Sequence, residues 1–310
     1  MINSLFIFIV SLFLVIRGST LATAYSAKLA KGFNISKYTI GFIIVAIISI
    51  LPETFIAINA ALNGTPAFGL GTLFGSNIAD LTLIFAIITF AAGRSLKVES
   101  KILKNHTVYP FMLLLPLVLG FNGHFSRLEG LALIIAGAIF YYISLRNDPE
   151  RNVEIPKIEE GKFKNSTMLL FSMGILLTGA HFTVTSATEL AILLNVNPIL
   201  IGMLVVGLGT TIPELFFSLK SVKKQDDSMA IGDILGTVLA DATIVVGILA
   251  LISPFSFPTK IIYITGTFMV IASFVLFRFM KSGKSLSKLE AYGLFFFWIT
   301  FVLVEFIANK

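Results

Sequence analysis

Apolar segments follow one another along the whole chain, separated by short stretches that carry most of the charged side chains. A helix needs roughly 20 mostly apolar residues to cross a bilayer, whereas a spanning strand needs only about ten alternating ones. The lengths of the segments therefore predict helices, and the expected fold class is an all-α polytopic membrane protein with ten transmembrane helices. We place these helices at residues 5–24, 38–62, 68–92, 107–121, 128–145, 168–186, 198–219, 229–252, 261–279 and 289–307.

The composition agrees with a protein embedded in a membrane. Of the 310 residues, 56% are hydrophobic and only 13% are charged, and the mean hydropathy is +0.93. A soluble domain carries roughly 25% charged residues. The chain has no cysteine, which excludes disulfides and thiolate metal sites. The first segment lacks a basic start, so we interpret it as a membrane helix of a multi-pass cell-membrane protein and not as a cleaved signal peptide.

Basic residues are concentrated in alternate loops. The loops after the first, third, fifth, seventh and ninth predicted helices hold 19 of the 23 Lys and Arg residues. The opposite side has only Arg127, Lys260 and Lys310, and Arg17 lies within a helix. Because cytoplasmic loops are enriched in Lys and Arg, this asymmetry predicts that both termini lie outside. The net charge of +6 therefore reports topology and does not indicate nucleic-acid binding.

Residues 18–82 are repeated 161 positions further along the chain. Between residues 41–84 and 202–245, ten of the 44 aligned positions are identical. In the first copy these positions are Gly41, Val45, Pro52, Glu53, Phe55, Gly71, Gly75, Ala79, Asp80 and Thr82. Charged residues inside the membrane are costly, so their duplication points to function.

The duplication also predicts the organisation of the chain. Residues 1–146 form the first five-helix repeat, 147–165 a short cytoplasmic linker, and 166–310 the second five-helix repeat. Since each repeat has an odd number of helices, the second copy enters the membrane from the opposite side. We therefore expect two inverted repeats related by an axis in the membrane plane.

Hydroxyl and carboxyl side chains share a helix face in each copy. Ser49 and Glu53 lie four residues apart, and Thr210 and Glu214 repeat this spacing. Pro52 cannot donate a backbone hydrogen bond, so it frees a carbonyl in the preceding turn that must meet protein, water or an ion. Such oxygen ligands suit sodium, calcium or magnesium and poorly suit zinc or copper.

The next helix of each copy adds a second pair. Ser76 and Asp80 share one face, as do Thr237 and Asp241. We expect these two aspartates and the two glutamates to meet near the membrane midplane, where four carboxylates cannot all stay ionised without cations or protons. A single proline, glycine stripe or carboxylate has a structural explanation, but the duplication in register favours a cation site.

Two of these motifs resemble the α-repeat signatures of the sodium/calcium exchanger family, within the calcium/cation antiporter superfamily. The motifs are Gly209-Thr210-Thr211-Ile212-Pro213-Glu214 and Gly75-Ser76-Asn77-Ile78. The resemblance covers the whole chain and implies a prokaryotic-type ten-helix antiporter that transports Ca²⁺ and Na⁺ without a cofactor. It also implies a cluster of four ion positions, and first and sixth helices that slide over a fixed core. The ion ligands it implies are Glu53, Glu214, Asp80, Asp241, Ser49, Ser76, Thr210, Thr211 and Thr237.

The first copy departs from the family signature. Ile50 presents no oxygen where its counterpart Thr211 does, and Asp80 stands where many relatives carry Asn. Asp233 also replaces a common Asn and has Thr72 as its counterpart. A lost neutral ligand weakens a sodium site, and an added carboxyl carries a proton or a further cation. Exchange of Ca²⁺ for H⁺ on the same fold is therefore the alternative to exchange for Na⁺.

Two functions of other classes explain the sequence less well. An intramembrane aspartyl protease needs two Asp on neighbouring helices, but the duplicated Pro-Glu motif has no role in that chemistry. A cation channel with carboxylate rings is less consistent with a closed two-fold site than a carrier is. We therefore expect an antiporter and no enzyme, with transported ions and lipid as its partners and no obligatory protein partner.

Two further polar residues lie in the predicted first and sixth helices. For Arg17, pairing with an acid or reaching to the membrane surface competes with a role in gating. We interpret His181 as a buried, hydrogen-bonded histidine rather than a proton relay.

Overall fold

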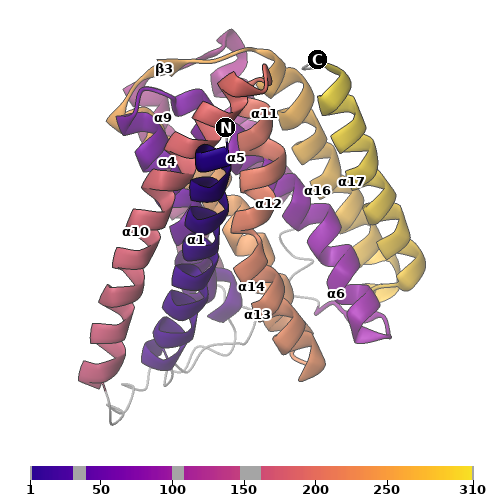
Figure 1. Ribbon diagram of the computed structural model, residues 1–310. Coiled ribbons are helices and arrows are strands. Elements are labelled where there is room, and N and C mark those ends of the chain that lie inside the picture. Colours follow the sequence, from indigo (N-terminus) through magenta and orange to yellow (C-terminus); the bar gives the residue numbers. More distant parts are fainter. Residues whose placement is uncertain (1, 31–39, 100–107, 147–161, 309–310) are drawn as a thin grey trace.

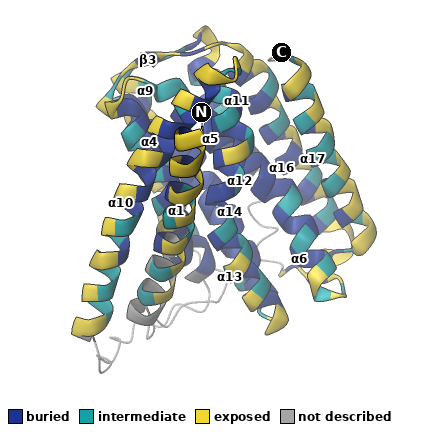
Figure 2. Ribbon diagram, viewed as in Figure 1, coloured by how far each residue is buried: buried dark blue, intermediate teal, exposed yellow. Residues whose placement is uncertain are grey.

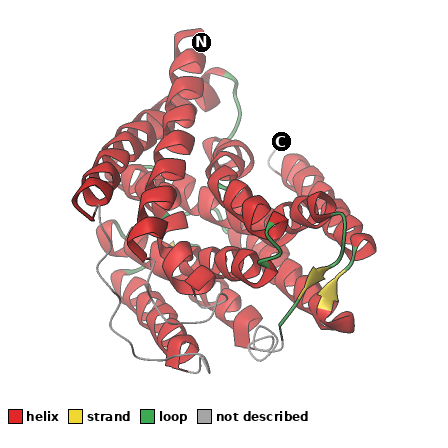
Figure 3. Cartoon of the chain, turned by 90° about the horizontal axis from the view of Figure 1, so that it is seen from below, coloured by secondary structure: helices red, strands yellow, loops and turns green. Residues whose placement is uncertain are grey.

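The computed structural model describes residues 2–30, 40–99, 108–146 and 162–308, and nearly all of these residues are helical (Figures 1 and 3). In these residues, seven helices are long and apolar enough to cross a membrane, or eight if a bent pair at 41–62 is one span. Two shorter apolar helices, Ile2–Gly18 and Val108–Asn122, fall where the first and fourth helices were predicted. A membrane protein with seven or eight spanning helices is thus supported, and the count of ten stays a prediction.

The first half starts with one long helix and then a divided one. Helix α1 (Ile2–Ala30) is longer at both ends than predicted, and the second predicted helix is split into η1 (Ile40–Val45), α3 (Ala46–Ser49) and α4 (Leu51–Leu62). The other elements of this half are α5 (Pro66–Ala79), η2 (Asp80–Ile84), α6 (Phe85–Ala92), β1 (Leu96–Lys97), α8 (Val108–Leu119), η3 (Gly120–Asn122), β2 (His124–Phe125) and α9 (Arg127–Arg146).

The second half starts with α10 (Lys162–Leu193), which includes residues 162–165 of the predicted linker. The rest of that linker, 147–161, lies outside the described residues. The other elements are α11 (Pro198–Ile201), η4 (Gly202–Val206), α12 (Gly207–Thr210), α13 (Ile212–Lys223), α14 (Asp227–Ala240), η5 (Asp241–Val245), α15 (Val246–Ile252), β3 (Phe255–Ser256), η6 (Ile261–Gly266), α16 (Thr267–Lys281), η7 (Ser282–Lys284), β4 (Ser285–Leu286) and α17 (Lys288–Ala308).

The duplicated prolines break the second and seventh predicted helices at equivalent places. One break lies at Ile50, where the axis bends by 42°, and the other lies at Thr211. In each case the proline is the second residue of the following helix, where its missing N–H costs nothing. Three elements of the first half have counterparts in the second half that begin and end 161 residues later. These pairs are α4 and α13, α5 and α14, and η2 and η5, so the local structure repeats with the sequence.

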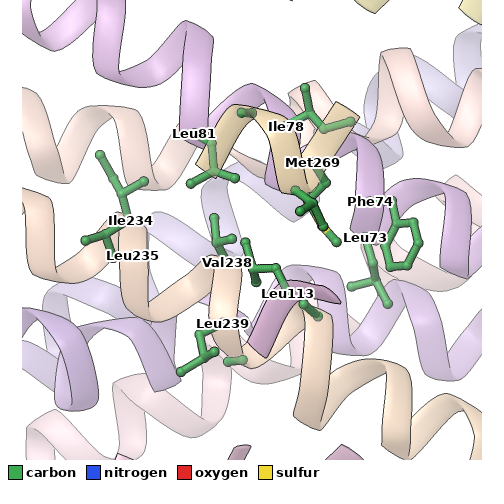
Figure 4. Close-up of a cluster of buried hydrophobic side chains, with 14 of the residues drawn as sticks. Leu73, Phe74, Ile78, Leu81, Leu113, Ile234, Leu235, Val238, Leu239 and Met269 are labelled. Atoms are coloured by element: carbon green, nitrogen blue, oxygen red, sulfur yellow. The ribbon is translucent and has the colours of Figure 1, made fainter. Parts of the chain in front are cut away.

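The two halves interlock through close helix crossings. A Cβ atom added to Gly41 would lie 2.3 Å from the carbonyl oxygen of Met229, and one added to Gly202 would lie 3.0 Å from that of Phe68. These two contacts correspond to each other in the repeat, because Gly202 is the counterpart of Gly41 and Met229 is the counterpart of Phe68. In one contact the glycine comes from the first half, and in the other it comes from the second half. Only glycine lets η1 contact α14 and η4 contact α5 at such distances. Around the crossings, side chains of α5 and α14 share one large apolar core (Figure 4).

Helices α5 and α14 are also the centre of the bundle. In the spans that contain them, Pro66–Ala92 and Asp227–Ile252, 83% of an 18-residue apolar stretch is buried, compared with 35% in Phe163–Leu193 of α10. Figure 2 shows the same contrast between the dark interior and the exposed outer face of α10. Any site carried by α5 and α14 is therefore shielded from the surroundings on most sides.

Helices α1 and α10 pack along each other and stand beside the rest of the bundle (Figure 1). At their crossing, a Cβ atom on Gly18 would lie 3.0 Å from the backbone nitrogen of Leu176, and one on Gly179 would lie 2.9 Å from that of Val15. The pair meets the other helices through a second apolar cluster, separate from the main core. This cluster contains Phe8, Val15, Ile56, Ala60, Phe68, Leu176, Ala180, Val184, Ala187, Leu190 and Val206.

Polar contacts and short ribbons join the halves at the ends of the bundle. Strand β1 pairs antiparallel with β4, and β2 pairs antiparallel with β3. Beside β1, Arg94 donates hydrogen bonds of 2.6 and 2.8 Å to the two carboxylate oxygens of Asp227, which also accepts from the backbone amide of Lys97 at 2.9 Å. The hydrogen bond with Asp227 raises the pKa of the Arg94 guanidinium, which therefore stays charged. The end of α6 is thus fixed to the start of α14.

Candidate functional site

Five buried acidic side chains lie where the two halves interlock: Glu53, Asp80, Glu214, Asp233 and Asp241, each at most 1% exposed. They come from α4, η2, α13, α14 and η5. These acids lie close enough together to repel one another electrostatically. Asp80 and Glu214 each interact with Glu53 and Asp233, and Asp241 interacts with Glu53 and Asp80. The structure thus gathers acids from both halves into one electronegative region.

Each glutamate occupies the first turn of a helix that begins in the bundle interior. Glu53 is the third residue of α4, and Glu214 is the third residue of α13. A helix N-terminus carries a partial positive charge, which offsets part of the cost of burying these carboxylates. The proline breaks therefore explain how this charge is tolerated at two equivalent places.

The aspartates and hydroxyls form two polar ladders on neighbouring helices. Side chains four residues apart share a helix face, and eight residues span about 12 Å along the axis. Both ladders reach an aspartate that opens a π-helical turn, a feature often found at functional sites. One ladder consists of Thr72, Ser76 and Asp80, and the other consists of Asp233, Thr237 and Asp241.

Most of the buried carboxylate oxygens lack a hydrogen-bond partner among the described residues. Such atoms are rare in proteins, because burial without a partner costs several kcal/mol for a charged group. No Lys or Arg in the described segments pairs with these five acids. The eight unpartnered oxygens are Oε2 of Glu53, both Oδ of Asp80, both Oε of Glu214, Oδ2 of Asp233 and both Oδ of Asp241. This donor set fits a hard cation.

The acids do not converge on a single point. Within the described part of the chain, no group of three or more Asp, Glu or His side chains is close enough to hold a metal ion by itself. A centre formed by four carboxylates at once therefore stays a prediction. A cation bound among these residues takes much of its coordination from hydroxyl and carbonyl oxygens, as Ca²⁺ and Na⁺ commonly do.

The five predicted hydroxyl ligands are buried beside the acids. Their exposed fractions are at most 1%: Ser49, Ser76, Thr210, Thr211 and Thr237. The Thr210 hydroxyl donates to the carbonyl oxygen of Gly207 at 2.9 Å and also lies beside the Glu53 carboxyl, in the other half. The Thr237 hydroxyl has no partner in the described residues. Burial places all these side chains in the interior, and their role as ligands stays a prediction.

Asp233 was not among the predicted ligands, yet it belongs to this region. Its Oδ1 accepts a hydrogen bond of 3.0 Å from the hydroxyl of Ser49 in the other half. The sequence could have indicated that Asp233 belongs to this polar region. Asp233 lies four residues before Thr237 and eight before Asp241, on the same helix face.

Arg17 and His181 lie away from the acids, on the surface of the α1–α10 pair. Arg17 is exposed, and its guanidinium carbon lies 5.2 Å from the ring centroid of Phe13. His181 is also exposed and meets Phe182 edge to face. The interpretation of His181 as a buried histidine is therefore wrong, because its position on α10 faces outward.

Comparison with known proteins decides the family. The family model described as sodium/calcium exchanger protein matches residues 3–146 and 165–307. The chain belongs to the sodium/calcium exchanger family. Members of this family are multi-pass membrane transporters and not enzymes, so the aspartyl protease alternative is wrong.

Several known proteins are similar to this chain over most of their length. An uncharacterized membrane protein of Methanocaldococcus jannaschii is 29% identical, over 89% of this chain and 90% of its own. The sodium/calcium exchanger MaX1 of Methanosarcina acetivorans is 23% identical over 97% of each chain. A solved structure of the sodium-calcium exchanger NCX_Mj, soaked with Na⁺ and Sr²⁺, has a TM-score of 0.72 and 25% identity over 96% of this chain and 97% of its own. The fold is therefore that of an exchanger.

Proposed function

We propose that this family member is a secondary active antiporter that exchanges Na⁺ for Ca²⁺ across the cell membrane. The observation that carries the proposal is the pair of duplicated motifs whose buried carboxylates lack partners among the described residues. A fixed ion pair would have supplied a Lys or Arg, whereas a transporter must leave these oxygens for its cargo. Two similar proteins, MaX1 and NCX_Mj, are named as sodium/calcium exchangers.

The proposed architecture has ten transmembrane helices in two inverted five-helix repeats, 1–146 and 166–310, with both termini outside. Support comes from the glycine contacts that recur with the halves exchanged, and from the two chain ends, which lie toward the same end of the bundle (Figure 1). In this arrangement the acids lie near the membrane midplane, where the two repeats meet.

Neutralising the negative charge of the buried acids allows the protein to alternate between its two open states. Without bound cations, repulsion among the acids and their burial make the region costly to enclose. Several Na⁺ ions or one Ca²⁺ supply compensating charge, after which the α1–α10 pair slides across the second apolar cluster and opens the other side. Because both ions use the same oxygens, one must leave before the other binds, which makes the transport an exchange.

The alternative is exchange of Ca²⁺ for H⁺. It is favoured by Ile50, which removes a neutral oxygen, and by Asp80 and Asp233, which add carboxyl groups that accept protons. The fold and the acids are common to both versions, so only a transport measurement distinguishes them.

Calcium-45 uptake into proteoliposomes, driven in turn by outward Na⁺, K⁺ and H⁺ gradients at a clamped membrane potential, tests the proposal. We expect saturable uptake driven by Na⁺, and its loss in Glu53→Gln and Glu214→Gln, since each removes one charge from the buried cluster. The matched control is Glu189→Gln, the same change on the exposed face of α10. Uptake driven only by H⁺ would establish the alternative, and uptake that needs no counter-ion would indicate a channel. Normal uptake by both site variants would refute the assignment of the site.

A further inference from the structure

The two ends of the electronegative region differ in chemistry. We define the Ser49 end by Ser49, Ile50 and Asp233, and the Thr210 end by their counterparts Thr210, Thr211 and Thr72, each 161 residues away. At the Ser49 end one of the three side chains is a carboxylate, whereas at the Thr210 end all three are hydroxyls. The repeat therefore breaks its symmetry where the two halves meet.

The hydroxyls of the Thr210 end all have backbone partners. Thr210 donates to the carbonyl oxygen of Gly207 at 2.9 Å, Thr72 to that of Phe68 at 3.0 Å, and Thr211 to that of Leu208 at 3.0 Å. The three side chains of this end are thus neutral oxygens, and the carboxyl of Glu53 lies beside one of them, Thr210.

The Ser49 end has a different arrangement. Its hydroxyl donates to Oδ1 of Asp233 at 3.0 Å, while Oδ2 has no hydrogen-bond partner in the described residues. Ile50 contributes no oxygen. Compared with the Thr210 end, this end has lost two hydroxyls and gained one carboxylate.

Asp233 is held in place by close packing of the two halves. A Cβ atom on Gly41 would lie 2.9 Å from the backbone nitrogen of Asp233, so η1 and α14 touch at this level. The side chain is 0% exposed, and the nearby acids Glu53, Asp80 and Glu214 all repel it. A fixed carboxylate with one bonded oxygen, one unpartnered oxygen and only negative neighbours needs a cation from outside the protein.

We propose that Asp233 and Ser49 form a cation position that holds a monovalent alkali ion of sodium's class more tightly than its counterpart at the Thr210 end. The inference rests on the proposed function and deepens it. One carboxylate charge matches one monovalent ion, whereas Ca²⁺ takes six to eight oxygens and commonly several carboxylates. Because the loop before α14 belongs to the Lys- and Arg-rich side, the Ser49 end faces the cytoplasm. Cytoplasmic Na⁺ thus saturates exchange at a lower concentration than external Na⁺.

The test compares sodium-dependent calcium-45 flux in right-side-out and inside-out vesicles, so that Na⁺ is varied on one face at a time. Asp233→Thr gives the Ser49 end the residue of its counterpart, and Asp233→Asn keeps the shape and the acceptor for Ser49. We expect both variants to raise the KM for cytoplasmic Na⁺ about tenfold, equivalent to a 1.4 kcal/mol change. The KM for external Na⁺ should change by less than about twofold. The reciprocal variant Thr72→Asp should lower the KM for external Na⁺.

Two results would overturn the proposed cation position at the Ser49 end. An unchanged cytoplasmic KM in both Asp233 variants would overturn it, and so would equal shifts on the two faces, which would mean that Asp233 acts on the region as a whole. The wild-type vesicles separate this inference from the proposed function. If they show no exchange driven by Na⁺, the proposed function fails. If their exchange is normal and only the predicted shift is missing, the Ser49 position alone fails.

Discussion

At the scale of single residues, spacing within a helix was a reliable guide. The hydroxyl and carboxyl groups predicted to share a face are all buried in the same region, because residues four apart on a helix necessarily point the same way. The bond between Ser49 and Asp233 could not be predicted in this way. It joins residues 184 positions apart, and only the packing of η1 and α3 on α14 brings them together. The outward direction of His181 was missed for the same reason.

The difference between Ile50 and Thr211 leads to a prediction at this scale. In Ile50→Thr, the new hydroxyl can donate to the carbonyl of Ile47, three residues back, as Thr211 does to Leu208. Its lone pairs then add a neutral ligand at the Ser49 end. We expect the KM for Na⁺ to fall about threefold, or ~0.7 kcal/mol, in calcium-45 uptake. Ile50→Val is the control, since it has the shape of threonine without the oxygen. Identical behaviour of the two variants would show that no ion uses this position.

At the scale of elements, apolar periodicity located the helices but not their internal details. The breaks at Ile50 and Thr211 follow from proline, as expected from its missing N–H. The π-helical turns that begin at Asp80 and Asp241 were not anticipated. A π turn shifts the backbone hydrogen bonds by one residue and leaves no distinctive pattern in an apolar segment. The excess length of α1, and of α10 at its start, was missed because these end turns contain polar residues typical of loops.

The separate apolar cluster beneath α1 and α10 predicts that this pair moves as a unit. The chain has no cysteine, so a disulfide within a double-cysteine variant can only join the two introduced residues. A Cβ atom on Gly209 would lie 2.6 Å from Cδ1 of Leu12, so Leu12→Cys with Gly209→Cys should join α1 to α12. We expect oxidation to lower calcium-45 uptake at least about tenfold and reduction to restore it, because the sliding step is blocked.

The control for this cross-link ties together two helices that move with each other. Ser11 and Thr183 have hydroxyls 3.1 Å apart across the interface of α1 and α10. Oxidised Ser11→Cys with Thr183→Cys should therefore transport like its reduced form. If the link between α1 and α12 leaves transport intact, the pair does not slide over the core.

At the scale of the whole molecule, the internal repeat predicted more than composition alone. Equivalent element boundaries and crossings, such as Gly41 on Met229 and Gly202 on Phe68, recur in the two halves. What the repeat could not predict is how the halves differ: Arg94 binds Asp227, whose counterpart in the first half is Pro66. Differences of this kind arise from substitutions in one copy alone, which the repeat does not predict.

The central claim is that the duplicated carboxylates hold the transported cation. Equilibrium binding of calcium-45 to the purified protein, with Na⁺ as competitor, tests it most directly. We predict saturable binding that Na⁺ displaces, and a loss of affinity of at least about tenfold in both Glu53→Gln and Glu214→Gln, with Glu189→Gln unchanged. Calcium binding of undiminished affinity in the two site variants would contradict the account.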